Sequence, residues 1–145
     1  MQKFILMLAL VLLLGCIGIP GVKKLSGGEA TEWQRISDPV AEEMLQSLDS
    51  GDYGAYAGGF MEIAVPAKDK FDALRLETGK KLGKYKSKKF VAAYENSGEY
   101  EGMEIDAIAV QYDAEFEKGT KMVSLTFDKN DSSHKVGELY IDLQE

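Results

Sequence analysis

The spacing of apolar residues changes near Gly83, and this change limits the chain to folds that combine helices with a separate sheet. Before Gly83, apolar side chains recur every three or four residues, which is the period of an amphipathic helix: Val40, Ala41, Met44, Leu45 and Leu48. After Gly83 they recur at every second residue, which is the period of a half-buried strand: Ile108, Val110, Tyr112, Ala114 and Phe116. Helices followed by strands predict an α+β domain whose helices cover one face of the sheet.

Three helices are predicted in the first half of the chain. The first covers residues 38–50, because Asp38 is a suitable N-cap and proline at position 39 suits the first helical turn. Asp52 caps a second helix, and Pro66 starts a third. The inner side of the third helix is expected to carry Phe71, Leu74 and Thr78.

Four strands are predicted in the second half, over residues 85–95, 108–116, 123–127 and 137–143. The later strands are joined by short turns, which make neighbouring strands antiparallel. The expected fold is therefore α+β, with N-terminal helices packed on an antiparallel sheet of about four strands. The connection between the first two strands is rich in acids and predicts a polar, mobile loop: Glu95, Glu99, Glu101, Glu104 and Asp106.

The N-terminus carries a short apolar run. Residues 4–14 follow Lys3 and lead into Leu13-Leu14-Gly15-Cys16, which resembles the lipobox of prokaryotic lipoproteins. The resemblance implies a signal peptide over residues 1–15 and a diacylglyceryl group on the Cys16 thiol. Two acyl chains hold a protein firmly to a bilayer. The expected location is the extracytoplasmic face of the cell membrane, with a lipid anchor on Cys16.

Two other interpretations of the apolar run stay open. A plain secretory signal ends in a small-x-small cleavage site, and Leu13 does not suit the third position before Cys16. An uncleaved membrane anchor needs about 20 apolar residues. This run reaches Ile19 only if two glycines and the cysteine are counted. In each case the rest of the chain is expected to lie outside the cytoplasm.

Residues 16–37 are predicted to be a flexible tether, because they contain several glycines, one proline and little periodicity. Trp33 is the one large aromatic residue near the end of this segment. It is expected to dock onto the domain as a lid or staple, and a ligand contact is the alternative. The folded domain is then expected to cover residues 38–145.

Three short motifs in this domain resemble the small exported domains of the nuclear transport factor 2-like superfamily. They are Leu-x-x-Gly-Asp-Tyr at Leu48, Leu-Gly-x-Tyr at Leu82 and Lys-Val-Gly-x-Leu-x-Ile at Lys135. The resemblance implies a cone, in which a curved antiparallel sheet wraps over helices and often leaves a pocket at the open end. The superfamily includes isomerases, hydrolases and many non-enzymes, so the fold alone does not fix a function.

Two residues are weak candidates for catalysis. Superfamily enzymes place an acid–base pair inside the cone, and here Asp106 and Tyr112 share the predicted inward side of one strand. A carboxylate in a dry pocket can act as a base because burial raises its pKa. The alternative is that Asp106 is an edge carboxylate in water. His134 is expected to be a solvated turn residue.

Aromatic residues along the predicted helices and strands could line a binding pocket, with five as candidates: Tyr53, Tyr56, Phe60, Tyr85 and Tyr112. The alternative is that they form ordinary core. Six lysines also cluster between Lys80 and Lys89, with three of them predicted on one strand face. They are either a solvated strand protected from edge pairing or a contact for an anionic surface.

The composition disfavours several classes of partner and cofactor. A net charge of -7 disfavours nucleic acid, whose phosphates need a basic surface. One Cys and one His cannot supply a disulfide or a four-ligand structural zinc site, so no metal or cofactor is expected. Asn130 begins a formal glycosylation sequon, whose use depends on the organism.

These observations lead to one main hypothesis and two alternatives. The main hypothesis is a membrane-anchored surface lipoprotein whose domain binds a ligand or another protein without catalysis. The first alternative is a small-pocket enzyme, an isomerase or hydrolase, that uses Asp106 and Tyr112. The second is a self-associating domain that forms a homodimer through its sheet. A small apolar ligand is a further partner that the predicted pocket would accept.

Overall fold

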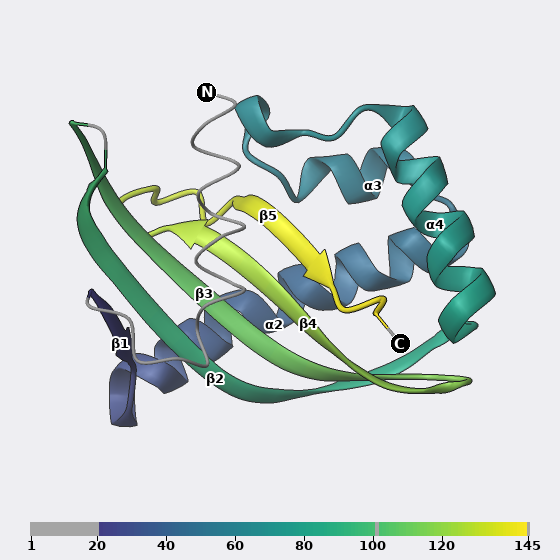
Figure 1. Cartoon of the computed structure of the whole chain (residues 1–145), viewed down its shortest axis with the longest axis horizontal. Helices are drawn as coiled ribbons and strands as arrows, with labels where there is room; N and C mark the ends of the chain where they lie inside the picture. The colour runs from purple at the N-terminus through teal and green to yellow at the C-terminus, as the bar shows by residue number, and fades with distance from the viewer. Residues whose placement is uncertain (1–20, 101, 145) are drawn as a thin grey trace.

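The computed structural model describes residues 21–100 and 102–144, and its elements follow the order predicted for an α+β domain (Figure 1). They are β1 (Val22–Lys24), α2 (Gly27–Ser50), α3 (Tyr53–Gly58), the 3-10 helix η1 (Glu62–Ala64), α4 (Lys68–Leu82), β2 (Tyr85–Tyr100), β3 (Met103–Phe116), β4 (Gly119–Asp128) and β5 (Val136–Ile141). The predicted signal peptide over residues 1–15, Cys16 and the first residues of the predicted tether lie outside the described residues.

The sheet is an antiparallel meander with the strand order β1-β2-β3-β4-β5. The α+β class is therefore confirmed, and the described sheet has five strands where about four were predicted. The additional strand is β1, whose Val22 pairs with Asn96 at the edge of β2. It was missed because three residues carry too little periodic signal to be recognised among glycines.

Helix α2 begins at Gly27, so the prediction of a flexible segment as far as residue 37 is wrong for the described residues. Its start was predicted at Asp38 because Pro39 suits a first helical turn, yet Pro39 lies inside the helix. An internal proline removes one backbone hydrogen bond and destabilises a helix by about 3 kcal/mol. Packing offsets this cost: Trp33 stacks on Phe127 at 5.6 Å between ring centroids, and Ser37 is fully buried.

The other helices follow the predicted pattern. Asp52 caps α3, because its side chain accepts a hydrogen bond from the backbone N–H of Ala55 at 3.0 Å. Helix α4 turns Phe71, Thr78 and Leu82 inward. Gly51 ends α2 in the left-handed conformation, with φ 82°, which glycine adopts without a steric cost.

Strands β2 and β3 form one long hairpin that continues through the acidic segment. The prediction of a mobile loop there is wrong: β2 extends to Tyr100 and β3 begins at Met103, with Glu99 paired with Glu104. The register of this hairpin shifts twice, between Tyr85 and Ser87 and between Phe90 and Ala92. Such bulges change which side chains face the core.

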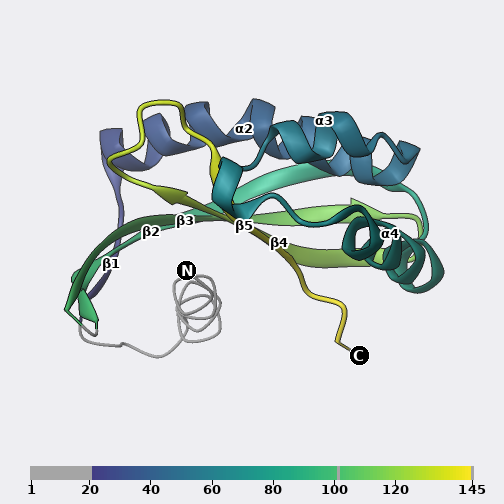
Figure 2. The same ribbon diagram turned by 90° about the horizontal axis from the view of Figure 1, so that it is seen from above.

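The core lies between α2, α3 and one face of the sheet, as Figure 2 shows from above. Alternate residues of β3 and β4 supply its centre, and they are almost entirely buried: Ile108, Val110, Tyr112, Ala114, Val123, Leu125 and Phe127. Ala41, Met44, Leu45 and Leu48 of α2 pack against them. The alternation predicted for these two strands is therefore confirmed.

Helix α4 is held at the end of the sheet where β2 begins. The backbone N–H of Lys118 donates to the carbonyl of Leu82 at 2.9 Å, and the N–H of Glu117 donates to Lys84 at 3.0 Å. These bonds tie the end of α4 to the turn between β3 and β4. They leave a space between α4 and the C-terminal half of α2.

Candidate functional site

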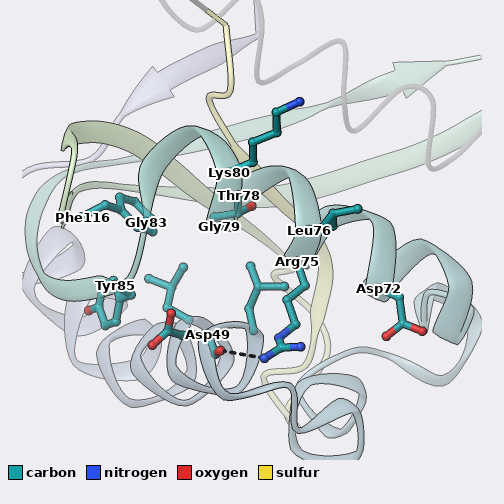
Figure 3. Close-up of a pocket in the computed structure, with 12 residues that line it drawn as sticks. Asp49, Asp72, Arg75, Leu76, Thr78, Gly79, Lys80, Gly83, Tyr85 and Phe116 are labelled. Carbon is teal, nitrogen blue, oxygen red and sulfur yellow. Dashed lines mark hydrogen bonds between the residues drawn. The ribbon is translucent and has the colours of Figure 1, made fainter.

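An open groove lies between α2 and α4 and has a volume of about 590 Å³ (Figure 3). Twelve residues from four elements line it: Leu45, Leu48, Asp49, Asp72, Arg75, Leu76, Thr78, Gly79, Lys80, Gly83, Tyr85 and Phe116. We call it the α2–α4 groove. Its volume falls within the range of roughly 300–1,000 Å³ that is typical of small-molecule sites.

The surface of the groove is mainly apolar. Leu45 and Leu48 come from the inner face of α2, and Phe116 comes from the end of β3. Gly79 contributes to the opposite wall without a side chain, and a Cβ added there would meet no atom within 4 Å. The missing side chain at Gly79 therefore keeps part of the groove open.

Leu76 stands at the mouth of the groove with 75% of its surface exposed. Burial of a leucine side chain is worth about 1.5–3 kcal/mol, so an exposed leucine beside an apolar hollow favours contact with another apolar group.

Two cations border the groove without an ion pair in the described chain. The guanidinium of Arg75 donates to the backbone carbonyl of Asp49 at 3.3 Å, close to the C-terminal end of α2. It forms no ion pair with a described carboxylate, and the same is true of Lys80. Of the two acids in the groove lining, Asp72 is paired with Lys68 at 2.7 Å.

Thr78 is the unusual residue of this wall. It is only 5% exposed, and its Oγ1 is buried without a hydrogen-bond partner in the part of the chain that the structure describes. A buried hydroxyl without a partner costs about 1–3 kcal/mol. Arg75 and Thr78 are three residues apart on α4, so they lie on the same face of the helix.

A polar network joins α2 to the sheet beside the groove. The hydroxyl of Tyr85 donates to Oε2 of Glu42 at 2.7 Å, and Lys88 donates to the same oxygen at 3.1 Å. The first register shift of β2 turns Lys88 toward α2, where its ammonium also lies 5.4 Å from the centre of the Tyr112 ring. Lys88 is therefore part of the helix–sheet contact and differs from the exposed lysines around it.

The pKa values of Tyr85 and Glu42 are both shifted away from pH 7. Burial raises the pKa of Tyr85, and its hydrogen bond to Glu42 raises it further. Burial by itself would raise the pKa of Glu42, but the hydrogen bonds from Tyr85 and Lys88 outweigh it and place the pKa below 4.5. At neutral pH the tyrosine is protonated and the carboxylate is charged.

The two weak catalytic candidates have separate partners. The hydroxyl of Tyr112 is hydrogen-bonded to Ser37 and donates to Oδ1 of Asp38 at 2.8 Å, deep between α2 and β3. Burial raises the pKa of Tyr112. Asp106 instead accepts from the Ser97 hydroxyl at 2.9 Å and from Asn130 at 3.3 Å. The structure does not bring Asp106 and Tyr112 together as a pair.

Of the five aromatic residues considered for a pocket, Tyr85 lines the α2–α4 groove. Tyr56, Phe60 and Tyr112 are buried in the core, where Tyr56 packs on Phe71 at 4.8 Å between ring centroids. Tyr53 is half-buried and donates its hydroxyl to the carbonyl of Pro66 at 2.8 Å. The alternative interpretation, ordinary core packing, describes these four residues.

Trp33 and His134 meet at the other end of the molecule. Their ring centroids are 6.0 Å apart, and Trp33 also stacks on Phe127. The expectation that Trp33 docks onto the domain is confirmed. His134 lies in the turn before β5 with φ 51°.

Glu138 was not singled out in the sequence. It lies on β5, where its Oε2 is buried without a hydrogen-bond partner in the described chain. Burial raises its pKa to about 7. Its place in an alternating strand gives no signal of this burial, because Glu138 occupies an outward position in the pattern.

Across residues 21–100 and 102–144, no three acidic, histidine or cysteine side chains gather as metal ligands. In the same part of the chain no helix has the length and apolarity needed to cross a membrane.

Comparison of the chain with protein-family models, with curated proteins and with solved structures gave no match. The geometry of the α2–α4 groove is therefore the basis for assigning a function.

Proposed function

We propose that the protein is a membrane-anchored surface lipoprotein whose folded domain binds a ligand or a partner without catalysing a reaction. The observation that carries the binding role is the α2–α4 groove. It combines an apolar lining with an exposed leucine, the Arg75 guanidinium, and a buried hydroxyl that has no hydrogen-bond partner among the described residues. Such a mixture of apolar surface and a few polar groups is typical of small-molecule sites.

The lipid anchor rests on the sequence of the N-terminal segment. The apolar run after Lys3 ends at Leu13-Leu14-Gly15-Cys16, which resembles the lipobox at which prokaryotic lipoproteins are acylated and cleaved. Acylation of Cys16 would place the domain at the extracytoplasmic face of the cell membrane.

A non-catalytic role is supported by the tyrosine–carboxylate pair beside the groove. General acid–base catalysis works best with a pKa near the working pH. The pKa of Tyr85 is raised and that of Glu42 is lowered, so neither group exchanges a proton readily near pH 7. The pair instead fixes α2 against β2.

We also propose that the domain belongs to the nuclear transport factor 2-like superfamily. The order of helices before an antiparallel meander and the three short motifs support this assignment. An experimental structure of the domain would test it, because a cone requires the sheet to enclose the helices.

The anchor is tested by replacing the sulfur of Cys16. Cells that make the wild-type protein are compared with cells that make Cys16→Ser, by detergent-phase partition and by mass spectrometry of the N-terminus. We expect the wild-type protein to begin at a diacylated Cys16 and to enter the detergent phase. The serine variant should carry no lipid and should keep residues 1–15. Equal partition and identical N-termini would contradict the lipoprotein assignment.

The binding role is tested by filling the groove. Gly79→Leu adds a side chain where a Cβ has free space, and Gly28→Leu makes the same change at an open position near the start of α2. Both variants should fold. We expect Gly79→Leu alone to lose binding of an apolar fluorescent probe, and equal binding by both variants would contradict a role for the groove.

A further inference from the structure

The chemistry of the α2–α4 groove identifies a class of ligand for it. The apolar lining is bordered on α4 by a guanidinium and a buried hydroxyl, contributed by Arg75 and Thr78 (Figure 3). An occupant that satisfies all of these groups must have an apolar body and an anionic end. This ligand class rests on the proposed binding role of the groove.

We propose that the α2–α4 groove binds an aliphatic carboxylic acid, with its chain along Leu45, Leu48 and Phe116 and its carboxylate at Arg75 and Thr78.

The apolar lining accounts for the chain. Leu45 and Leu48 are buried residues that face the groove from α2, and Phe116 closes its base from β3. Each methylene group moved from water to such a surface should strengthen binding by about four-fold. A volume of about 590 Å³ leaves room for a chain of medium length.

The balance of charge accounts for the acid. The ammonium of Lys68 already neutralises Asp72 at 2.7 Å, which leaves Asp49 as the one carboxylate of the groove lining without an ion pair among the described residues. Arg75 reaches toward Asp49 of α2, whereas the Lys80 side chain points to the opposite side of α4 (Figure 3). The Arg75 guanidinium is therefore the positive group that an anionic end would meet, within a chain of net charge -7. This charge favours an anion over a cation.

Thr78 makes the assignment more specific than charge alone. Its hydroxyl is buried in the groove wall and has no partner in the described part of the chain. The hydroxyl is buried, so a rotation of the Thr78 side chain toward the groove is needed before a carboxylate beside Arg75 can accept its hydrogen bond. Binding would thereby supply the partner that Thr78 lacks among the described residues.

The Arg75 side chain is held in place at the groove by contacts with the end of α2. One of its five N–H groups is used by the carbonyl of Asp49 at 3.3 Å. The guanidinium packs against Gly51, where an added Cβ would lie 2.8 Å from its central carbon. The side chain is thus held in position, and its remaining donors are available for a carboxylate.

The experiment compares three amphiphiles that share one chain and differ in the end group. Dodecanoic acid, dodecanol and dodecyltrimethylammonium are titrated into the delipidated chain below their micellar concentrations, with calorimetry as the readout. We expect the acid to bind roughly ten-fold or more tightly than the alcohol, because a charge-assisted hydrogen bond is worth about 1.5–3 kcal/mol. The cation should bind most weakly.

Two variants locate the carboxylate. Thr78→Val keeps the shape of the side chain and removes a hydroxyl that has no partner among the described residues, so the fold should be as stable as the wild type or more stable. It should lose several-fold in affinity for the acid and keep its affinity for the alcohol. Arg75→Gln should reduce the affinity for the acid to that for the alcohol, and Lys121→Gln, away from the groove, should change neither.

The possible results separate the two proposals. Equal binding of acid and alcohol that is lost in Gly79→Leu would overturn the carboxylic acid while leaving the groove as a binding site. Unchanged binding of the acid in Thr78→Val and Arg75→Gln would also overturn it. Absence of binding by all three amphiphiles would overturn it as well, while the separate Cys16→Ser experiment would still report on the membrane anchor.

Discussion

The hydroxyl of Tyr85 lies 2.7 Å from Oε2 of Glu42, and this hydrogen bond joins the first residue of β2 to the middle of α2. Lys88 reaches the same oxygen at 3.1 Å and is only 12% exposed. One carboxylate therefore holds two separate positions of β2 against the helix. The contact fixes the register between the helical layer and the sheet.

Glu42→Gln should destabilise the domain, because Lys88 would lose its counter-ion in a nearly buried position. The Glu42 side chain is itself 37% exposed, so solvent screening limits the expected cost to about 1 kcal/mol. Urea unfolding followed by circular dichroism measures the change. Glu43→Gln, at the exposed neighbouring position, is the matched control and should stay within about 0.5 kcal/mol of the wild type.

The effect of Glu42→Gln on the free energy of unfolding should depend on pH. The folded-state pKa of Glu42 lies below its ordinary value of 4.5, so its stabilising contribution is present above pH 4.5 and is lost as the pH falls through the folded-state pKa. We expect the difference between the wild type and Glu42→Gln to shrink toward zero in strong acid. A constant difference between pH 7 and pH 2 would contradict the charge as its origin.

Tyr112→Phe should destabilise the domain by about 1–2 kcal/mol, because it removes a buried hydroxyl bonded to both Ser37 and Asp38. Tyr140→Phe is the control, since the structure gives the Tyr140 hydroxyl no partner among the described residues. A double-mutant cycle with Ser37→Ala isolates the contribution of the Ser37 contact. Additive effects of the two substitutions would show that this contact adds nothing.

Glu138→Gln should stabilise the domain at alkaline pH. The pKa of Glu138 is raised to about 7 in the folded state, from an ordinary value of 4.5, so the folded state keeps this proton longer than the unfolded state. Stability therefore falls as the pH rises from 4.5 to 7. The glutamine variant should gain about 1–3 kcal/mol above pH 7 and nothing below pH 4.5.

The measurement for Glu138 is thermal or urea unfolding at pH 4 and at pH 8. Glu104→Gln provides a comparison on β3 with the same loss of charge at an exposed position. A gain in both variants would indicate that net charge, and not the burial of Glu138, is the cause.

Trp33→Ala should destabilise the domain by about 2–3 kcal/mol, because Trp33 is half-buried and packs on Phe127 at 5.6 Å between ring centroids. Trp33→Phe, which keeps an aromatic ring, should cost less. Circular dichroism during urea unfolding measures both variants. Tryptophan fluorescence cannot, because the chain has no tryptophan other than Trp33. An unchanged midpoint for Trp33→Ala would contradict a stabilising role for this contact and would favour the original prediction of a tether for residues 27–37.

The helical caps and the inward residues of β3 and β4 could be predicted from sequence because local chemistry determines them. Asp52 and Gly51 act within one turn of the chain, and the alternation from Ile108 to Phe116 needs no knowledge of distant residues. The start of α2 could not be predicted in this way. There the local signal of Pro39 is outweighed by the contact of Trp33 with Phe127, which comes from a remote strand.

The face of Lys88 illustrates a second limit. Strict alternation places it with Lys84 and Lys86, but the register shift between Tyr85 and Ser87 turns it toward Glu42. A bulge leaves no pattern in a run of lysines. The groove could not be predicted for a related reason. Its lining residues, such as Leu45, Arg75 and Phe116, come from separate elements. Each of them fits an ordinary surface or core pattern in its own part of the sequence.

The length of α2 determines how far the groove would stand from a membrane to which Cys16 is anchored. Cys16 and Gly21 are five residues apart, a span of at most about 18 Å even when fully extended. The N-terminal end of α2 follows β1, and its 24 residues carry the chain about 36 Å to the end where α4 packs. A lipid on Cys16 would hold the β1 end near the bilayer and leave the groove at the far end of α2. The domain would then collect its ligand from the surrounding medium and not from the lipids in which it is anchored.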